Sequence, residues 1–315
     1  MPAPSSPTEP TPTDTADGPR RCGFVAVIGA PNAGKSTLVN RFVGEKVSIV
    51  SPKVQTTRMR VMGVAVAGAT QIVFVDTPGI FAPKRRLERA MVKAAWRGAG
   101  EADIVLLTVD AARRDPLGEN DDIIGGLRRD GRKSVLALNK IDLVKRDTLL
   151  ALADAFFATG VVSDVFMISA GRGDGTGDLF AHLVARMPEG PWHFPPDQLT
   201  DLPLRLVAAE IVREQLFRQL HQELPYSLTV EPESWEEFQD GSARIACVVL
   251  IERESHKPIV LGKGGQRIKS VRVAAQAELE RMLDRKVHLL LHVTVQQDWL
   301  DRREHYGALG LDYEA

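Results

Sequence analysis

Short apolar runs alternate with helical patterns over the first 187 residues. The apolar runs predict buried strands at 24–28, 60–66, 71–75, 104–109, 134–138 and 165–168. Apolar residues at helical spacing follow the first strand at Leu38, Val39, Phe42 and Val43, and helical patterns recur near 85–98, 119–129, 147–158 and 177–187. Because strands that alternate with helices form a mostly parallel sheet with helices on both faces, we predict an α/β fold here.

The order of elements changes after a proline-rich segment that begins at Pro188. Beyond it the pattern predicts a helix (203–221), two strands (226–231 and 243–252), a glycine-rich turn (262–265), a helix (266–283) and a strand (286–296). Consecutive strands without a helix between them are typical of an α+β domain. We therefore predict a disordered tail (1–20), an α/β domain (21–187), a linker (188–203), an α+β domain (204–300) and a C-terminal tail (301–315).

Composition narrows the class of protein. The chain has 315 residues, of which 44% are apolar, and its net charge is -1, so affinity for nucleic acid requires a local basic patch. Cys22 and Cys247 lie far apart without a Cys/His cluster, which favours a reducing compartment, with no structural metal and no disulfide. No apolar run reaches the roughly 20 residues of a membrane span. Residues 1–20 are rich in Pro, Thr, Ser and Asp and fit neither a signal nor a transit peptide, so we expect a cytoplasmic protein.

A glycine-rich loop follows the first predicted strand. It matches the pattern G-x-x-x-x-G-K-[ST], in which glycines let the backbone curl so that its N–H groups point inward. The helix that follows adds the partial positive charge of its N-terminus. Lys35 is expected to reach the β- and γ-phosphates, and the Ser36 hydroxyl to ligate Mg²⁺. The residues predicted to bind the phosphates are Gly29, Ala30, Pro31, Asn32, Ala33, Gly34, Lys35, Ser36 and Thr37.

Two further segments are candidates for the phosphate and metal site. Asp76 ends the strand 71–75 and can hold Mg²⁺ through its water, and the Gly79 N–H can approach a γ-phosphate. In the segment 44–62, the Thr57 hydroxyl is a candidate to complete the Mg²⁺ coordination shell when a γ-phosphate is present and to leave it after hydrolysis. Such a change would make this segment a nucleotide-dependent switch. The alternatives are an ordinary D-T-P-G turn and a solvated surface loop. The predicted catalytic residues are Lys35, Thr57, Asp76 and Gly79, and the predicted metal ligands are Ser36, Thr57 and Asp76.

Residues after the strand 134–138 indicate guanine as the base. The Asp142 carboxylate can accept two N–H bonds from guanine, whereas adenine presents an acceptor there and is rejected. Asn139 is predicted to tie the base to the phosphate loop, and the Lys140 stem to cover the face of the base. The Ser169–Ala170 dipeptide is predicted to supply a backbone N–H for guanine O6. A polar helix cap is the alternative for 139–142.

Basic residues gather around the glycine-rich turn of the second domain. A G-x-x-G turn between helices lets a nucleic-acid backbone come close, while the helix N-terminus and nearby cations meet phosphates. The element order, with a helix and two strands ahead of the turn, fits a KH domain of the bacterial type. A glycine turn with a solvated basic face is the alternative. The predicted RNA-binding residues are Lys257, Gly262, Lys263, Gly264, Gly265, Arg267, Lys269 and Arg272.

The loops of the first domain, in their order along the chain, resemble those of the translation-factor-related GTPases. Ile80 stands where many of these proteins place a water-orienting Gln, and its apolar side chain cannot bond a water, so we expect slow unaided hydrolysis. GTPases that resemble this chain use an Asn at the position of Asn32 to hold a potassium ion near the phosphates. Dependence on K⁺ is therefore a hypothesis.

Over about residues 20–310 the sequence resembles the Era family of bacterial ribosome-assembly GTPases. The matching stretches are 29–37, 47–58, 76–80 and 139–142, then 199–201, 210–215, 223–227 and 259–268. The resemblance implies an α/β P-loop GTPase domain followed by an α+β type II KH domain, with GTP or GDP and Mg²⁺ as ligands. It also implies binding of the 3′ end of 16S rRNA, assistance in the assembly of the 30S subunit and peripheral association with the inner face of the cell membrane. We expect the protein to be a monomer. Arg272 departs from the Gly that relatives tend to have there, and the tail 1–20 has no counterpart in the family.

Two functional hypotheses stay open at this point. In the first, the chain is a GTPase switch whose nucleotide state controls RNA binding. In the second, it is an RNA-binding chaperone for which GTP is mainly an allosteric ligand, which Ile80 favours. A small-molecule kinase is disfavoured, because the residues 139–142 indicate guanine and the sequence shows no site for an acceptor substrate.

Overall fold

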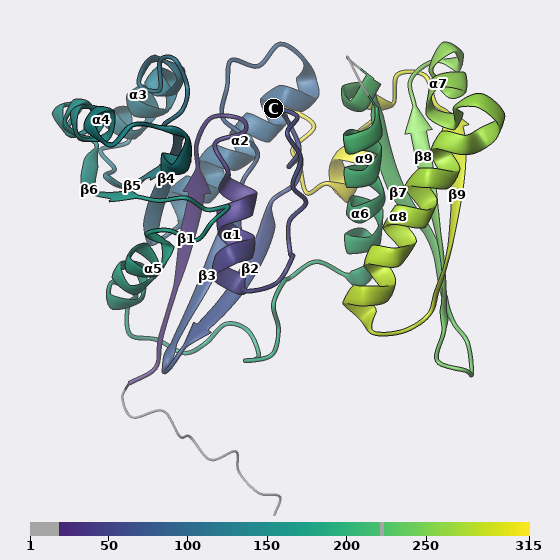
Figure 1. Cartoon of the computed structure of the whole chain (residues 1–315), viewed down its shortest axis with the longest axis horizontal. Coiled ribbons are helices and arrows are strands. Elements are labelled where there is room, and N and C mark those ends of the chain that lie inside the picture. The colour runs from purple at the N-terminus through teal and green to yellow at the C-terminus, as the bar shows by residue number, and fades with distance from the viewer. Residues whose placement is uncertain (1–18, 221–223) are drawn as a thin grey trace, which may run out of the picture.

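The computed structural model describes residues 19–220 and 224–315, in which two sheets form the centres of two units (Figure 1). The first sheet has six strands. In spatial order they are β2 (Val61–Ala67), β3 (Thr70–Asp76), β1 (Arg21–Ile28), β4 (Ile104–Asp110), β5 (Ser134–Asn139) and β6 (Val162–Met167). β2 is antiparallel to β3, and the other neighbouring pairs are parallel. The predicted, mostly parallel α/β fold is confirmed.

Helices cover both faces of this sheet, because its central strands are apolar on both sides. On one face lie α2 (Arg86–Glu101), α3 (Asp121–Arg129) and α4 (Arg146–Ala158), which share a core with β1, β4 and β5. On the other face lie α1 (Lys35–Val43) and α5 (Thr176–Ala185), which form a second core with β1 and β3. The carboxyl ends of the parallel strands meet at one edge of the sheet, so the loops after β1, β3, β4 and β5 come together there.

The second unit is an α+β arrangement, as predicted. Its sheet has the order β7 (Leu228–Glu237), β8 (Ala243–Ile251) and β9 (Val287–Val295), with β7 antiparallel and β9 parallel to β8. The helices α6 (Leu204–Gln219) and α8 (Gln266–Leu283) pack together on one face of this sheet and form one core with it. The short helix α7 (Lys257–Leu261) precedes α8.

Three strands differ from prediction by three residues or more at one end. β1 begins at Arg21, although the prediction began at 24. β7 continues to Glu237 through a polar run, because it is an edge strand whose outer residues contact solvent, and its register shifts between Pro232 and Ser234. The apolar pattern alone therefore predicted too early an end for β7. β6 begins at Val162 and ends before Ile168, although the prediction began at 165. The tail predicted for 1–20 lies outside the described residues except for 19–20, and residue 223 of the matching stretch 223–227 is outside them too.

The segment predicted as a C-terminal tail packs on the first unit instead. A 3-10 turn (Trp299–Asp301) and α9 (Arg303–Ala308) place Trp299, Tyr306 and Leu311 against Leu87 and Met91 of α2. The apolar residues of 299–315 are too widely spaced to show a helical pattern. Their partners lie far away in the sequence, on α2 and, for Nε1 of Trp299, at the Ser227 carbonyl. Of the helices within 19–220 and 224–315, none has the length and apolar character that crossing a membrane requires.

Candidate functional site

The loop after β1 has its predicted glycines at positions where no other residue fits. Gly29 has φ 150°, and a Cβ there would lie 2.2 Å from the Thr108 carbonyl oxygen. Gly34 has φ 96°, and a Cβ there would lie 2.2 Å from Nδ2 of Asn139. Both residues also have a backbone conformation that disfavours a side chain. The close approach of β4 and β5 to the loop is therefore possible only with glycine.

Lys35 begins α1, and its ammonium group points back into the curl of the loop. Its Nζ donates to the carbonyls of Gly29 at 3.1 Å and Ala30 at 3.0 Å. Burial lowers the pKa of Lys35 to about 8, although the nearby carboxylate of Asp76 opposes this shift. A buried cation whose hydrogen bonds within the described residues go to carbonyls is poised to bind an anion that enters the loop.

Three predicted metal ligands converge beside this lysine. Ser36 Oγ donates to Oδ2 of Asp76 at 2.6 Å and lies 2.9 Å from Oγ1 of Thr57. Thr57 Oγ1 lies 3.5 Å from the same carboxylate oxygen. Burial raises the pKa of Asp76, while the Ser36 hydroxyl and the Lys35 ammonium oppose the shift.

The chemistry of these three side chains suits a small, hard cation. Asp76 is fully buried, and within the described residues its Oδ1 has no hydrogen-bond partner. A buried, unpartnered carboxylate oxygen beside two hydroxyls is a ligand set of the kind that Mg²⁺ prefers. The residues therefore fit the predicted ion.

The loop after β3 is held against the phosphate loop. The Ile80 N–H donates to the Gly29 carbonyl at 3.1 Å, and a Cβ on Gly79 would lie 3.0 Å from Cα of Pro31. The Ile80 side chain is buried and packs in the core with Ala26 and Ile28. It points away from the site, so residue 80 offers no polar side chain to a water there.

Asn139 links three loops at the end of β5. Its Nδ2 donates to the Ala33 carbonyl at 2.8 Å, and its Oδ1 accepts from the N–H groups of Lys140 at 2.8 Å and Ala170 at 2.9 Å. The Ser169 N–H donates to the Asp174 carbonyl at 2.9 Å. Both N–H groups of the Ser169–Ala170 dipeptide thus have acceptors within the protein, and donation to a guanine O6 has to compete with these bonds.

Lys140 and Asp142 lie on either side of a sharp turn. Lys140 has φ 64°, and its Nζ donates to Oδ2 of Asp110 at 2.6 Å. The Asp142 carboxylate is 18% exposed and lies 3.5 Å from Nε of Arg172. Part of this side chain is therefore accessible to a ligand, although Asp142 does not line the cavity formed by the phosphate loop and Lys140.

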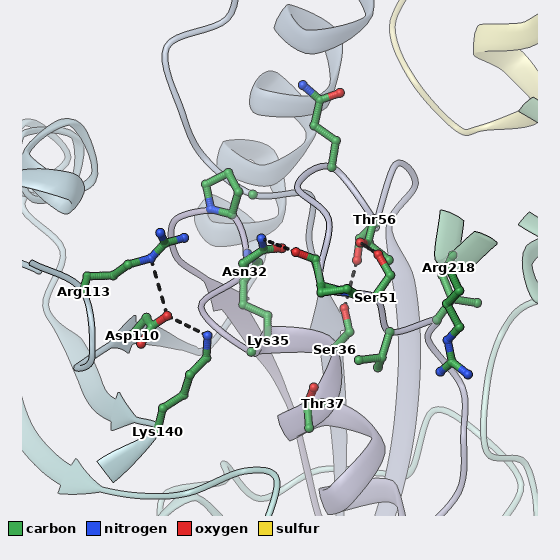
Figure 2. A pocket seen from close by; sticks show the side chains of 18 residues that line it. Asn32, Lys35, Ser36, Thr37, Ser51, Thr56, Asp110, Arg113, Lys140 and Arg218 are labelled. Atoms are coloured by element: carbon green, nitrogen blue, oxygen red, sulfur yellow. Dashed lines mark hydrogen bonds and ion pairs between the residues drawn. The ribbon is translucent and has the colours of Figure 1, made fainter. Parts of the chain in front are cut away.

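Several residues of the site were missed by sequence reasoning. Asp110 ends β4 and pairs with Lys140 and with Arg113, whose Nε lies 3.5 Å away (Figure 2). A polar residue at the end of an apolar strand was the available signal for Asp110. Arg218 comes from α6 of the second unit, and no pattern in the sequence indicated that it belongs to this site. These residues and the phosphate loop line one cavity of about 590 Å³, which the segment 49–57 closes on one side.

Asn32 joins that segment to the phosphate loop. It has φ 63°, and its Nδ2 donates to the Pro52 carbonyl at 2.9 Å (Figure 2). Since the amide nitrogen is used, Oδ1 is the atom of Asn32 that can face a cation. This oxygen has no hydrogen-bond partner within the described residues.

The glycine-rich turn of the second unit lies between α7 and α8. It lines a surface hollow of about 560 Å³ together with Lys257, Pro258 and Glu254. Lys263 and Lys269 are exposed, whereas Arg267 Nη1 donates to the Ile259 carbonyl and Arg272 Nη1 donates to Oε1 of Gln276 at 3.0 Å. Of the predicted RNA-binding residues, Lys257 and residues 262–265 line this hollow, and the two arginines that follow on α8 are held in place by hydrogen bonds.

Comparison with known proteins covers both units. Residues 24–140 match the family model of 50S ribosome-binding GTPases, and residues 223–300 match that of KH domains. GTPase Era of Maricaulis maris (strain MCS10) is 54% identical over 312 residues, which are 95% of this chain and 99% of that protein. GTPase Era of Caulobacter vibrioides (strain NA1000 / CB15N) is 56% identical over 315 residues, which are 96% and 99% of the two chains.

Solved structures agree with these relatives. The crystal structure of Era in complex with MgGDPNP and nucleotides 1506–1542 of 16S ribosomal RNA superposes with a TM-score of 0.87 at 38% identity. An Era variant of Aquifex aeolicus bound to GDP.AlF4- gives the same TM-score and identity. Each covers 92% of this chain and 99% of its own.

Proposed function

The chain belongs to the Era family of GTPases, and on that premise we propose that it is a GTP-binding and GTP-hydrolysing switch that binds the 3′ end of 16S rRNA. Its role would be to assist the assembly of the 30S subunit. The observation that carries the proposal is that Asn139 donates to the Ala33 carbonyl and accepts from the Ala170 N–H. These bonds join the phosphate loop to both base-binding segments, beside the cluster of Ser36, Thr57 and Asp76.

The residues of the chain have distinct roles in this proposal. The loop 29–34 and Lys35 bind the phosphates, and the Gly79 N–H contacts the γ-phosphate. Asp142 selects guanine, and Lys140 covers the base while Asp110 fixes its ammonium group. Ser36, Thr57 and Asp76 would hold Mg²⁺, which when bound neutralises charge on the phosphates. With Ile80 buried, the chain itself offers no polar side chain at residue 80 for the attacking water, so turnover is slow.

Replacing Ser36 by Ala should raise the Mg²⁺ concentration that half-saturates GTP binding by at least about tenfold, because one of three converging oxygens is lost. Titration of Mg²⁺ at fixed GTP analogue measures this. Ser163→Ala on β6 is the matched control, because its hydroxyl donates to the Ser134 carbonyl, away from the site. An unchanged Mg²⁺ requirement in Ser36→Ala would show that this hydroxyl is not a ligand.

Potassium should accelerate hydrolysis relative to sodium, because Oδ1 of Asn32 is free to ligate a cation near the phosphates. We expect a single-turnover rate about tenfold higher in K⁺, equivalent to about 1.4 kcal/mol of barrier. Asn32→Gly, which suits the positive φ of this residue, should give the same rate in both salts. Equal rates of the unchanged chain in K⁺ and Na⁺ would remove the hypothesis.

RNA binding tests the function as a whole. Crosslinking the full chain to cellular RNA should recover small-subunit rRNA preferentially, and more of it with a GTP analogue than with GDP. Lys263→Glu should weaken binding of a 16S 3′-end oligonucleotide about tenfold and reduce its salt dependence, since a phosphate contact becomes a repulsion. Lys145→Glu, an equal charge change on an exposed residue of the first unit, is the control. A random RNA spectrum that ignores the nucleotide would contradict the proposal.

The remaining features belong to the same proposal. The GTPase domain would span 21–187, the linker 188–203 and the KH domain 204–300. The protein would act as a monomer in the cytoplasm, with peripheral contact to the inner face of the membrane. The burial of Ile80 keeps the chaperone alternative open, and a hydrolysis-deficient variant that retains Lys35 and still matures ribosomes would favour it.

A further inference from the structure

The segment 46–58, which contains Thr57, lies on helix α6 of the KH domain and is not a solvated loop. Glu214 of α6 is fully buried, and its carboxylate accepts from the Val50 N–H at 3.2 Å. Further contacts of the segment with this domain join Lys46 to Glu214 and Glu278, and Lys53 Nζ to the Phe217 carbonyl. Helix α6 thus holds the segment along its length.

The residues on both sides of Thr57 are held by the KH domain. The Thr56 carbonyl accepts from Nη2 of Arg213, which lies on α6. On the other side, Arg58 donates from Nη1 to the Leu228 carbonyl at 2.6 Å and from Nη2 to the Pro225 carbonyl at 3.1 Å. Arg58 and Arg213 are each only 1% exposed, so these bonds are shielded from water.

Within the described residues, only one of the two guanidinium groups pairs with a carboxylate. Glu210 accepts from Nε of Arg213 at 2.7 Å, and both arginines lie over the ring of Phe217, at 5.6 Å for Arg58 and 5.1 Å for Arg213. Within the described residues, Nε of Arg58 and Nη1 of Arg213 have no hydrogen-bond acceptor. Two buried cations with one counter-charge are costly. The two arginines therefore depend on the Thr56, Leu228 and Pro225 carbonyls as acceptors.

We infer that Arg213 and Arg58 are positioning residues for Thr57, so that the KH domain completes the Mg²⁺ and γ-phosphate part of the nucleotide site. The inference rests on the proposed function and adds its regulation. Thr57 lies 2.9 Å from Ser36 Oγ, so the position of its hydroxyl depends on where α6 holds residues 56 and 58. Because coupling between sites is reciprocal, GTP must favour the placement of α6 as strongly as α6 favours GTP.

Arg213→Gln tests this in the full-length protein. The variant loses the bidentate contact with Glu210 and the bond to the Thr56 carbonyl, 157 residues away. We expect the affinity for a non-hydrolysable GTP analogue to fall about tenfold, the effect of one buried bond with a charged donor, and the affinity for GDP to change less than about twofold. The Mg²⁺ concentration needed for analogue binding should rise in parallel. Arg213→Lys, which keeps a charged donor, should recover part of the affinity for the GTP analogue relative to that for GDP.

Two further variants keep the test independent of folding. Arg205→Gln, at the exposed start of the same helix, is the matched control and should leave both affinities unchanged. Lys53→Gln removes only the half-buried bond to the Phe217 carbonyl and should weaken analogue binding about threefold with GDP unchanged. GDP affinity reports whether each variant is folded.

The outcomes separate this inference from the proposed function. Equal losses for GDP and the GTP analogue in both Arg213→Gln and Lys53→Gln, or no loss in either, would overturn the inference. Failure of the unchanged chain to prefer GTP over ATP would instead overturn the proposed function.

Discussion

Replacing Asp142 by Asn should lower the affinity for GTP by at least about 100-fold and create affinity for xanthosine nucleotides, because the polar pairing with the base is reversed. A carboxylate accepts from guanine N1–H and the 2-amino group. An Asn amide presents one donor and one acceptor, which match the 2-carbonyl and N1–H of xanthine. Asp142 lies in the 3-10 turn after β5 with its carboxylate 18% exposed, so the substitution leaves the core unchanged.

Equilibrium titration with GDP, XDP and ADP measures this change of specificity. Asp147→Asn, on the exposed first turn of α4, removes the same charge and should have no effect. If Asp142→Asn binds GDP as the unchanged chain does, or if ATP competes as well as GTP in the unchanged chain, the guanine assignment is wrong.

Replacing Gly34 by Ala should weaken binding of GDP and GTP alike by more than about 100-fold, the effect of misplacing binding groups by about 1 Å. A Cβ at residue 34 would lie 2.2 Å from Nδ2 of Asn139, so the bond from Asn139 to Ala33 has to break. The loop then separates from both base-binding segments. Positive φ adds about 1–2 kcal/mol of backbone cost to the folded state.

The other end of the same helix offers the control. Gly44 follows α1 with φ 85°, close to the 96° of Gly34, but a Cβ there would meet no atom within 4 Å. Gly44→Ala should therefore show the backbone cost in thermal unfolding and leave nucleotide affinity nearly unchanged. Equal affinities of the two variants would mean that contact with Asn139 does not organise the site.

Arg58 and Arg213 show why a switch segment needs the second domain. Thr57 could be recognised as a candidate because a threonine precedes a strand beside a phosphate loop. The groups that hold it, Arg213 and the carbonyls of residues 225–228, lie in the other domain. No local pattern connects them with Thr57.

The sequence by itself determined the features that depend on neighbours along the chain. Periodicity predicted the parallel sheet and its helices, since strand and helix burial repeat over a few residues. The phosphate loop, Asp76 and the residues 139–142 follow strands directly, and parallel strands bring their carboxyl ends to one edge, so their common location could be predicted.

Only the tertiary structure decided which of these groups contact one another and what else contacts them. Asn139 reaches Ala33 across 106 residues, and Arg213 reaches Thr56 across 157. The packing of 299–315 on α2 likewise depends on a surface more than 200 residues earlier in the chain. A hydrogen bond or an apolar contact requires two groups at a few ångströms, and a sequence pattern specifies only one of them.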